Sequence, residues 1–219
     1  GIRPETSHHE RGPGQNEVDF RFSDAVTSAD NFITFKQVVK SIAARNGLFA
    51  SFSPKPLPDK SGSGLHVNLS LMQNGQNVFR LDDSDNSKTA RAFVAGVLKK
   101  ISEITAFLNP VPNSYERLGV CEAPKYVSWS HGNRSQLIRI PADSTERMRM
   151  ELRSPDPATN PYLAFALIIA AGFYGIENGL SLPESINVDL YNADESVIGT
   201  LPRLPENLGH ALKLAEKSD

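Results

Sequence analysis

Three short segments of the sequence alternate polar and apolar residues, and this pattern limits the possible folds more than any other feature. The segments are residues 17–22, 66–71 and 147–153. Alternation is typical of strands that bury one face, because successive side chains of a strand point to opposite sides. The polar faces of the last two segments carry His66, Asn68 and Ser70, and Arg149, Glu151 and Arg153.

Helical patterns separate these segments. Capping residues and helical periodicity predict helices over residues 27–45, 87–108, 161–178 and 206–217, and a further strand is predicted at 136–140. The irregular succession of strands and helices indicates an α+β fold, with a largely antiparallel β-sheet and helices packed on its apolar face. We therefore expect the polar face of the sheet to carry the chemistry.

Composition narrows the range of partners. The net charge of -2 gives no overall attraction to nucleic acid or to an anionic membrane, so neither is an expected partner. The longest apolar stretch, residues 162–174, is too short to span a bilayer and is interpreted as a buried helix. The single cysteine, Cys121, suits a reducing cytosol. No signal peptide is recognised, and we expect a cytoplasmic protein.

Two carboxylates flank a tight turn near the start of the chain. Glu10 and Glu17 stand on either side of a Gly-Pro-Gly sequence at residues 12–14, so they could converge on one cation. Mg²⁺ and Mn²⁺ favour carboxylate oxygens. From these residues alone, a solvated turn with unrelated charges is the stronger interpretation.

A glycine-rich sequence precedes the strand predicted at residues 66–71. Gly62 and Gly64 would let backbone N–H groups approach an anionic ligand closely, and His66 follows on the polar side. The sequence is not a Walker A loop, because it lacks the Gly-Lys-Ser/Thr ending. A structural histidine is the alternative here.

Five arginines form the third candidate group. Guanidinium groups bind carboxylates and phosphates bidentately and stay charged at any working pH. Surface salt bridges would explain any single one of them, but several project from predicted strands on the side of Glu151. Together with the carboxylates and His66 they predict a cleft for a metal-bound nucleotide and an acidic substrate. The arginines are Arg117, Arg134, Arg139, Arg149 and Arg153.

The ordered set of motifs resembles the catalytic domain of type I glutamine synthetases. The resemblance implies the glutamine synthetase/guanido kinase-type fold. It also implies that residues 1–219 form one catalytic-domain fragment, without the family's N-terminal β-grasp domain and C-terminal segment. The matching motifs occupy residues 8–17, 54–56, 62–66, 109–118, 122–124, 133–141 and 151–162.

The resemblance also implies a role for each matching residue. One metal ion would be held by Glu10 and Glu17, and a second by His66 and Glu151. Glutamate would be bound by Gly62, Arg117 and Arg153, and the nucleotide by Phe22, Asn68, Ser70 and Arg149. The catalytic residues would be Glu122, on a flap that closes the site, with Arg134 and Arg139.

The implied reaction joins ammonia to the γ-carboxylate of glutamate. ATP and two or more Mg²⁺ or Mn²⁺ ions would be required, and a γ-glutamyl phosphate would form first. Arg134 and Arg139 would stabilise the phosphoryl group in transfer, and Glu122 would accept a proton from the incoming ammonium. Family members form homo-oligomers, and a dodecamer is the expected assembly.

Several alternatives remain open. Ser61 and Asn68 depart from residues common in the family, which leaves a γ-glutamyl-amine or polyamine ligase possible. A catalytically silent structural or regulatory relative is another alternative, and a guanidino kinase is disfavoured by the four metal-ligand residues. The isolated fragment is expected to be inactive or nearly so. Tyr191 lies near the region where some bacterial members are adenylylated, which is interpreted as a coincidence of position.

Overall fold

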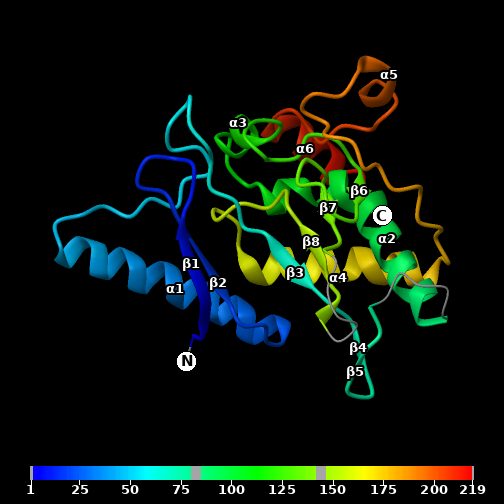
Figure 1. The fold of residues 1–219 in the computed structure, drawn as a ribbon, viewed down its shortest axis with the longest axis horizontal. Coiled ribbons are helices and arrows are strands. Elements are labelled where there is room, and N and C mark those ends of the chain that lie inside the picture. Colours follow the sequence, from blue (N-terminus) through cyan, green and yellow to red (C-terminus); the bar gives the residue numbers. More distant parts are fainter. Residues whose placement is uncertain (1, 80–84, 142–146, 219) are drawn as a thin grey trace.

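The computed structural model describes residues 2–79, 85–141 and 147–218. Helices and short strands alternate along this part of the chain (Figure 1). The elements are β1 (Pro4–His9), β2 (Asn16–Phe20), α1 (Ala25–Arg45), β3 (Val67–Leu69), β4 (Met72–Gln73), β5 (Gln76–Asn77), α2 (Asp85–Leu108), α3 (Ser114–Arg117), β6 (Trp129–Ser130), β7 (Ile138–Arg139), β8 (Met150–Leu152), α4 (Pro161–Glu177), α5 (Glu195–Ile198) and α6 (Leu208–Ala215).

A four-stranded sheet lies at the centre, in the order β3-β8-β7-β6. β8 pairs antiparallel with both β3 and β7, whereas β6 runs parallel to β7. The register sets Glu151 of β8 opposite Asn68 of β3 on one side and opposite Arg139 of β7 on the other. Directly paired residues point to the same face of a sheet. This row of three polar side chains therefore marks the polar face.

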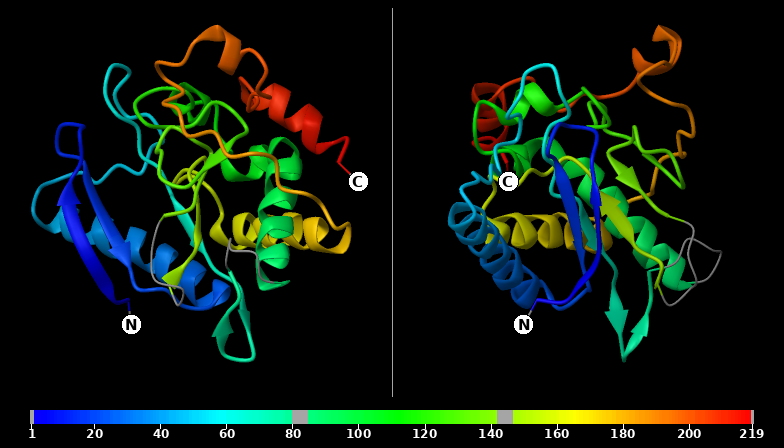
Figure 2. Two further views of the ribbon diagram at one scale, coloured as in Figure 1. Left: turned by 45° about the vertical axis from the view of Figure 1, so that its right-hand side comes forward. Right: turned by 60° about the vertical axis from the view of Figure 1, so that its left-hand side comes forward.

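The opposite face of the sheet is buried under α2 and α4 (Figures 1 and 2). Met150 and Leu152, which flank Glu151 on β8, are completely buried in the core that these helices share with the sheet. Burying side chains of this size is worth about 1.5–3 kcal/mol each. Because polar and apolar residues alternate along β8, one face of the strand packs in the core and the other carries the candidate site.

Two glycines allow α2 and α4 to cross at very short range. A Cβ atom on Gly96 would lie 2.2 Å from the carbonyl oxygen of Ala171, and one on Gly175 would lie 2.0 Å from that of Ala92. Both obstructing atoms belong to the backbone and cannot turn aside. The crossing therefore requires glycine at both positions.

The hairpin of β1 and β2 packs beside the central sheet, over α1 (Figures 1 and 2). Phe20 at the end of β2 meets Phe35 of α1 edge-to-face, with ring centroids 4.9 Å apart. Phe35 in turn contacts Phe52 in the loop after α1, at 6.0 Å. These aromatic contacts join the hairpin to the rest of the molecule.

The structure confirms the predicted α+β fold with helices on the apolar face of a largely antiparallel sheet. It corrects the start of α1, which lies at Ala25 instead of residue 27 and is capped by Asp24 through a 2.9 Å hydrogen bond from the Thr27 amide. The helix predicted at residues 161–178 is present as α4, and Asn160 caps it by accepting hydrogen bonds from the amides of Tyr162 and Leu163. In the described ranges, none of the helices is both long and apolar enough to cross a bilayer.

Candidate active site

Glu151 is the centre of the polar face. Its Oε1 atom accepts a hydrogen bond from Arg153 Nη1 at 3.0 Å and lies 3.4 Å from His66 Nδ1. Its Oε2 atom accepts from Arg139 Nε at 2.5 Å. Glu151 and Arg153 are 5% and 4% exposed. The structure thus brings together four of the predicted site residues on one sheet face.

The charges around Glu151 set its protonation. Burial alone would raise the pKa of Glu151, but His66, Arg153 and Arg139 outweigh it and lower the pKa to about 2. Burial lowers the pKa of His66, which favours the neutral imidazole. At neutral pH the site then holds one carboxylate and two close guanidinium groups. The excess of positive charge suits an anionic ligand, such as a phosphate or a carboxylate.

Arg117 binds the backbone just after β8, next to the Glu151 cluster. It is 3% exposed, and its Nη1 and Nη2 atoms donate to the carbonyl oxygens of Ser154 and Arg153 at 2.8 and 3.0 Å. Burial lowers its pKa to about 10, which still leaves the group charged at neutral pH. Both hydrogen bonds go to the backbone of this chain and do not bear on ligand binding. The predicted contact of Arg117 with glutamate therefore stays a prediction.

The glycine-rich sequence is shaped around the same arginine. A Cβ atom on Gly62 would lie 2.4 Å from the carbonyl oxygen of Pro54 and 2.9 Å from Arg117 Cγ. A Cβ atom on Gly64 would lie 2.7 Å from Arg117 Nη2 and 3.0 Å from His66 Nε2. Glycine is therefore required at position 62, where the backbone of Pro54 obstructs a side chain, while Gly64 leaves room for the side-chain ends of Arg117 and His66.

A second polar cluster lies at the end of the hairpin. His8, Glu10 and Glu17 each place one ligand atom within 4.8 Å of the others. His8 Nε2 lies 2.9 Å from Glu10 Oε1 and 3.9 Å from Glu17 Oε2. Burial and the neighbouring Glu10 raise the pKa of Glu17. The pKa of Glu10 is lowered, because hydrogen bonds from Glu17 and His8 outweigh its own burial.

This donor set fits a divalent metal ion. Two carboxylates that share a hydrogen bond repel each other when both are ionised, and a cation between them removes that repulsion. Carboxylate oxygens suit Mg²⁺ and Mn²⁺, and a neutral imidazole is also a common metal ligand. Glu10, Glu17 and His8 would hold such an ion.

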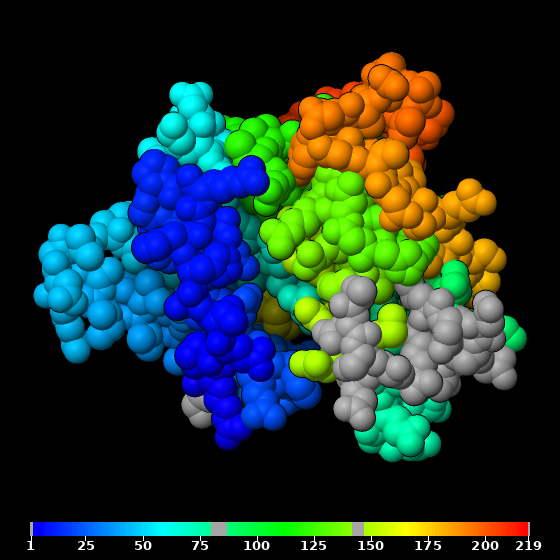
Figure 3. All heavy atoms as spheres, viewed as in Figure 1, coloured from blue at the N-terminus to red at the C-terminus, as the bar shows by residue number. Residues whose placement is uncertain are grey.

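Glu122 stands on a loop that faces the hairpin. Its carboxylate pairs with Arg11 Nη2 at 2.9 Å, and its carbonyl oxygen accepts from Arg153 Nη2 at 3.4 Å. Gln15 makes a second link, from its Nε2 atom to the carbonyl oxygen of Gly62 at 2.9 Å. Figure 3 shows the tip of the dark-blue hairpin meeting the light-green loop, with a hollow below them. The two polar clusters therefore lie on opposite sides of one recess.

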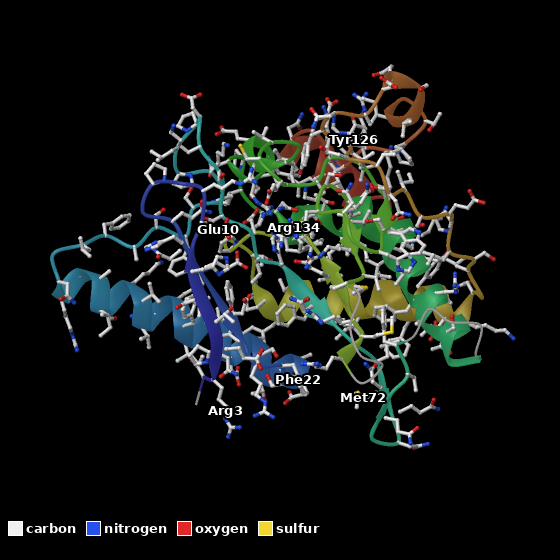
Figure 4. All side chains as sticks on the ribbon, in the orientation of Figure 1. Arg3, Glu10, Phe22, Met72, Tyr126 and Arg134 are labelled. Atoms are coloured by element: carbon white, nitrogen blue, oxygen red, sulfur yellow. The ribbon has the colours of Figure 1, made fainter. Side chains whose placement is uncertain are left out.

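Other predicted residues lie further from these clusters. Arg149 donates from Nε to Asn68 Oδ1 at 3.1 Å, so two of the predicted nucleotide-binding residues touch each other. Ser70 is exposed beyond the end of β3. Arg134 is exposed in a loop and lies across from Glu10 (Figure 4). Phe22 is 86% exposed and lies at the opposite end of the hairpin from Glu10 (Figure 4), and its predicted contact with the nucleotide stays a prediction.

Three site residues were not singled out by the sequence analysis. His8 stands two positions before Glu10, which on a strand means the same face. That signal was missed because residues 4–9 show no apolar alternation, and all six are exposed. Arg11 and Gln15 make contacts across the recess that depend on the folded loop positions, and no sequence spacing encodes such contacts.

The whole chain matches a family model described as "Glutamine synthetase, catalytic domain", over residues 1–219. A glutamine synthetase of Clostridium saccharobutylicum is 46% identical over 225 residues, covering 100% of this chain and 51% of that protein. One of Methanosarcina mazei is 52% identical over 198 residues, covering 89% of this chain and 44% of that protein. The chain thus spans about half the length of the curated relatives that it matches.

Two solved structures share the fold. One is described as "GmaS/ADP complex-Conformation 1", with a TM-score of 0.90 and 37% identity, covering 100% of this chain and 51% of that one. The other, "Apo GmaS without ligand", has a TM-score of 0.89 at the same identity, covering 99% of this chain and 50% of that one. The family model covers every residue and the fold agrees throughout. The chain therefore belongs to the glutamine synthetase family and corresponds to its catalytic domain.

Proposed function

We propose that the protein carrying this chain joins ammonia to the γ-carboxylate of glutamate at the expense of ATP. The observation that carries the proposal is the Glu151 cluster, in which two arginines contact one buried carboxylate and leave excess positive charge on the polar sheet face. A carboxylate is a poor electrophile and must be activated, here by conversion to a γ-glutamyl phosphate. Family membership supports this reaction class.

The residues of this chain would act by neutralising charge and excluding water. Arg139 and Arg134, which lies across the recess from Glu10, would stabilise the phosphoryl group in transfer, while Gly62, Arg117 and Arg153 orient glutamate. Glu122 would attract the ammonium ion and take its proton. The loop that carries Glu122 would shield the acyl phosphate, which water would otherwise hydrolyse. Asn68, Ser70, Arg149 and Phe22 remain the proposed nucleotide contacts.

Divalent cations would supply Lewis-acid charge neutralisation when bound. We propose Mg²⁺ or Mn²⁺, held on one side of the recess by Glu10, Glu17 and His8. On the other side, His66 and Glu151 offer the second set of ligands. For Glu151 this requires sharing a carboxylate that already accepts hydrogen bonds from Arg139 and Arg153.

A substrate screen tests the proposal. The protein is incubated with ATP, Mg²⁺, glutamate and one amine at a time, and phosphate release and the amide product are both measured. Ammonia is expected to support turnover best, with one phosphate released per glutamine. Phosphate release that needs no glutamate would contradict the proposed reaction.

A γ-glutamylamide synthetase is the second candidate. The two GmaS structures favour it, since the fold agrees over nearly the whole chain. Ser61 and Asn68 stand in the regions proposed to bind glutamate and nucleotide, where they depart from the usual family residues. A preference for methylamine, ethylamine or a polyamine over ammonia in the same screen would move the assignment to this candidate.

A catalytically silent relative would show no turnover in the screen, and it would also differ from an active enzyme in metal binding. Such a protein is expected to lose Mn²⁺ binding in the Glu151 cluster, so that Glu151→Ala would leave the calorimetric titration unchanged.

The protein that carries this chain is also proposed to act as a cytoplasmic homo-oligomer, a dodecamer in the assembly expected for the family. Sedimentation of the protein checks that assembly.

A further inference from the structure

A segment near the C-terminal end connects two loops of the proposed active site. We call residues 188–191 the bridging segment. Its Tyr191 hydroxyl donates to the carbonyl oxygen of Ala123 at 2.9 Å, next to Glu122. Its Leu190 amide donates to Ser135 Oγ at 2.9 Å, next to Arg134.

The bridging segment is firmly anchored. Leu190 is 4% exposed, and Gln136 donates from Nε2 to the carbonyl oxygen of Val188 at 3.0 Å. Ser135 is itself fixed, because its amide and hydroxyl both bind Asn133 Oδ1, at 2.9 and 2.8 Å. The bridging segment can therefore act as a rigid support for the loop that Tyr191 contacts at Ala123.

The loop that Tyr191 contacts needs such a support. Cys121 and Glu122 are consecutive non-glycine residues with φ of 49° and 69°. Left-handed backbone is unfavourable for residues with a side chain and persists only where the surroundings impose it. Within the loop, the carbonyl oxygen of Ala123 accepts only a 3.2 Å hydrogen bond from the Gly119 amide. The Tyr191 hydroxyl is the second and shorter bond to the same oxygen.

The chemistry of Tyr191 suits a permanent donor. Burial raises the pKa of its phenol, so the hydroxyl keeps its proton throughout the physiological range. Its side chain lies among charged groups of the site, since Arg153 and Glu122 both act on it electrostatically.

We propose that Tyr191 is a positioning residue that fixes the Glu122 loop through Ala123 and, by way of the bridging segment, ties that loop to the one carrying Arg134. The proposal rests on the proposed function, in which Glu122 deprotonates the amine and its loop excludes water. Loss of the hydroxyl would loosen the loop without removing any group that contacts substrate. Water would then reach the acyl phosphate more often, and phosphate would be released without amide product.

Tyr191→Phe tests the proposal, with Tyr162→Phe as the matched control. The Tyr162 hydroxyl also makes a single hydrogen bond, to Asp30 at 2.5 Å, but between α4 and α1. The first measurement is hydrogen exchange in peptides covering residues 118–124, where the amides of Gly119, Val120 and Ala123 are hydrogen-bonded. Tyr191→Phe is expected to speed exchange there about fivefold, the factor given by one hydrogen bond of ordinary strength. Tyr162→Phe should leave it unchanged.

The second measurement is the ratio of phosphate released to amide formed, with kcat and the KM for ATP. Tyr191→Phe is expected to raise that ratio and lower kcat, while the KM for ATP stays the same. Unchanged exchange overturns the proposal, and so does faster exchange with an unchanged ratio and kcat. If the unaltered protein makes no amide, the proposed function fails, and with it the catalytic part of this proposal. The exchange measurement still decides whether Tyr191 fixes the loop.

Discussion

At the scale of single residues, Glu151 connects stability to chemistry. It is a buried anion that contacts two arginines and lies beside His66, and the two guanidinium groups would lose this counter-charge if Glu151 were neutral. Removing one partner from a buried ion pair is costly, because the remaining charges are already out of water. The site residues of β8 therefore also hold the fold together.

Glu151→Gln tests this link, because it keeps the size of the side chain and removes its charge. We expect the free energy of unfolding to fall by about 3 kcal/mol, the scale for breaking a buried ion pair. Urea denaturation at neutral pH measures the change. Glu184→Gln is the control, because Glu184 is exposed, and should change stability by less than about 0.5 kcal/mol. Equal effects of the two substitutions would contradict the buried network.

Glu17→Gln tests the hairpin cluster. Without one of two carboxylates, Mn²⁺ should bind more weakly by at least about tenfold, the scale on which even outer partners of metal ligands act. Isothermal titration with MnCl₂ measures the affinity. Glu5→Gln removes the same charge from the exposed strand β1, outside the cluster, and is expected to leave the affinity nearly unchanged. A similar loss from both variants would indicate a general effect of charge.

The sequence predicts correctly which residues share a sheet face where they alternate on a strand. His66, Asn68, Glu151 and Arg153 follow the two-residue period, and the strand register brings them to one face. Arg117 was recognised as a site residue, but its hydrogen bonds to two backbone carbonyls depend on how a distant segment folds back. The same is true of the pair between Arg11 and Glu122. Contacts across loops are decided by the tertiary structure.

At the scale of elements, the crossing of α2 and α4 positions the sheet. The glycines at the crossing let the helix backbones touch, and the core residues of β7 and β8 pack against both helices. The long helices were predictable, because capping and apolar periodicity extend over many residues. Strand β1 is polar throughout and β6 has only two residues, so neither carries a pattern long enough to recognise.

Gly175→Ala tests the crossing. The added methyl group would collide with the carbonyl of Ala92 and with Gly96, so the helices must separate. Overpacking of this kind costs about 1–3 kcal/mol or more, and here it exceeds the small gain in helix propensity. Thermal unfolding followed by circular dichroism checks the loss. Gly132→Ala, where an added Cβ meets nothing within 4 Å, should be close to neutral. An unchanged melting temperature for Gly175→Ala would contradict the close approach.

At the scale of the whole molecule, the proposed site is shared between two parts. The hairpin carries one of the two proposed metal-binding clusters, with His8, Glu10 and Glu17, and the central sheet carries the other, with His66 and Glu151 (Figure 1). Among the described residues, Arg11 pairs with Glu122 and Gln15 donates to Gly62 across the recess. Figure 3 shows the hollow open to solvent on the face in view.

We propose that residues 1–219 alone do not complete the site. Glu10 and Glu17 keep 30% and 38% of their side-chain surface exposed, although their role requires closely held ligands. We expect residues 1–219 by themselves to make amide at least about a hundredfold more slowly than a full-length relative of the family, on the scale of losing one charge-stabilising group. A coupled assay for glutamate-dependent ADP release measures this. Comparable turnover of the two proteins would contradict the proposal.

The register of β8 also has a consequence for how such a sequence can change over generations. Met150 and Leu152 lie in the core and Glu151 lies between them on the other face, so one shift by a single position exchanges the two environments. A deletion of one residue within β8 would bury a carboxylate and present a thioether or a leucine to the substrate. During evolution, individual side chains of β8 can therefore be substituted, but the insertion or deletion of one residue in this strand is not tolerated. Deletion scanning of this strand should find no surviving variant.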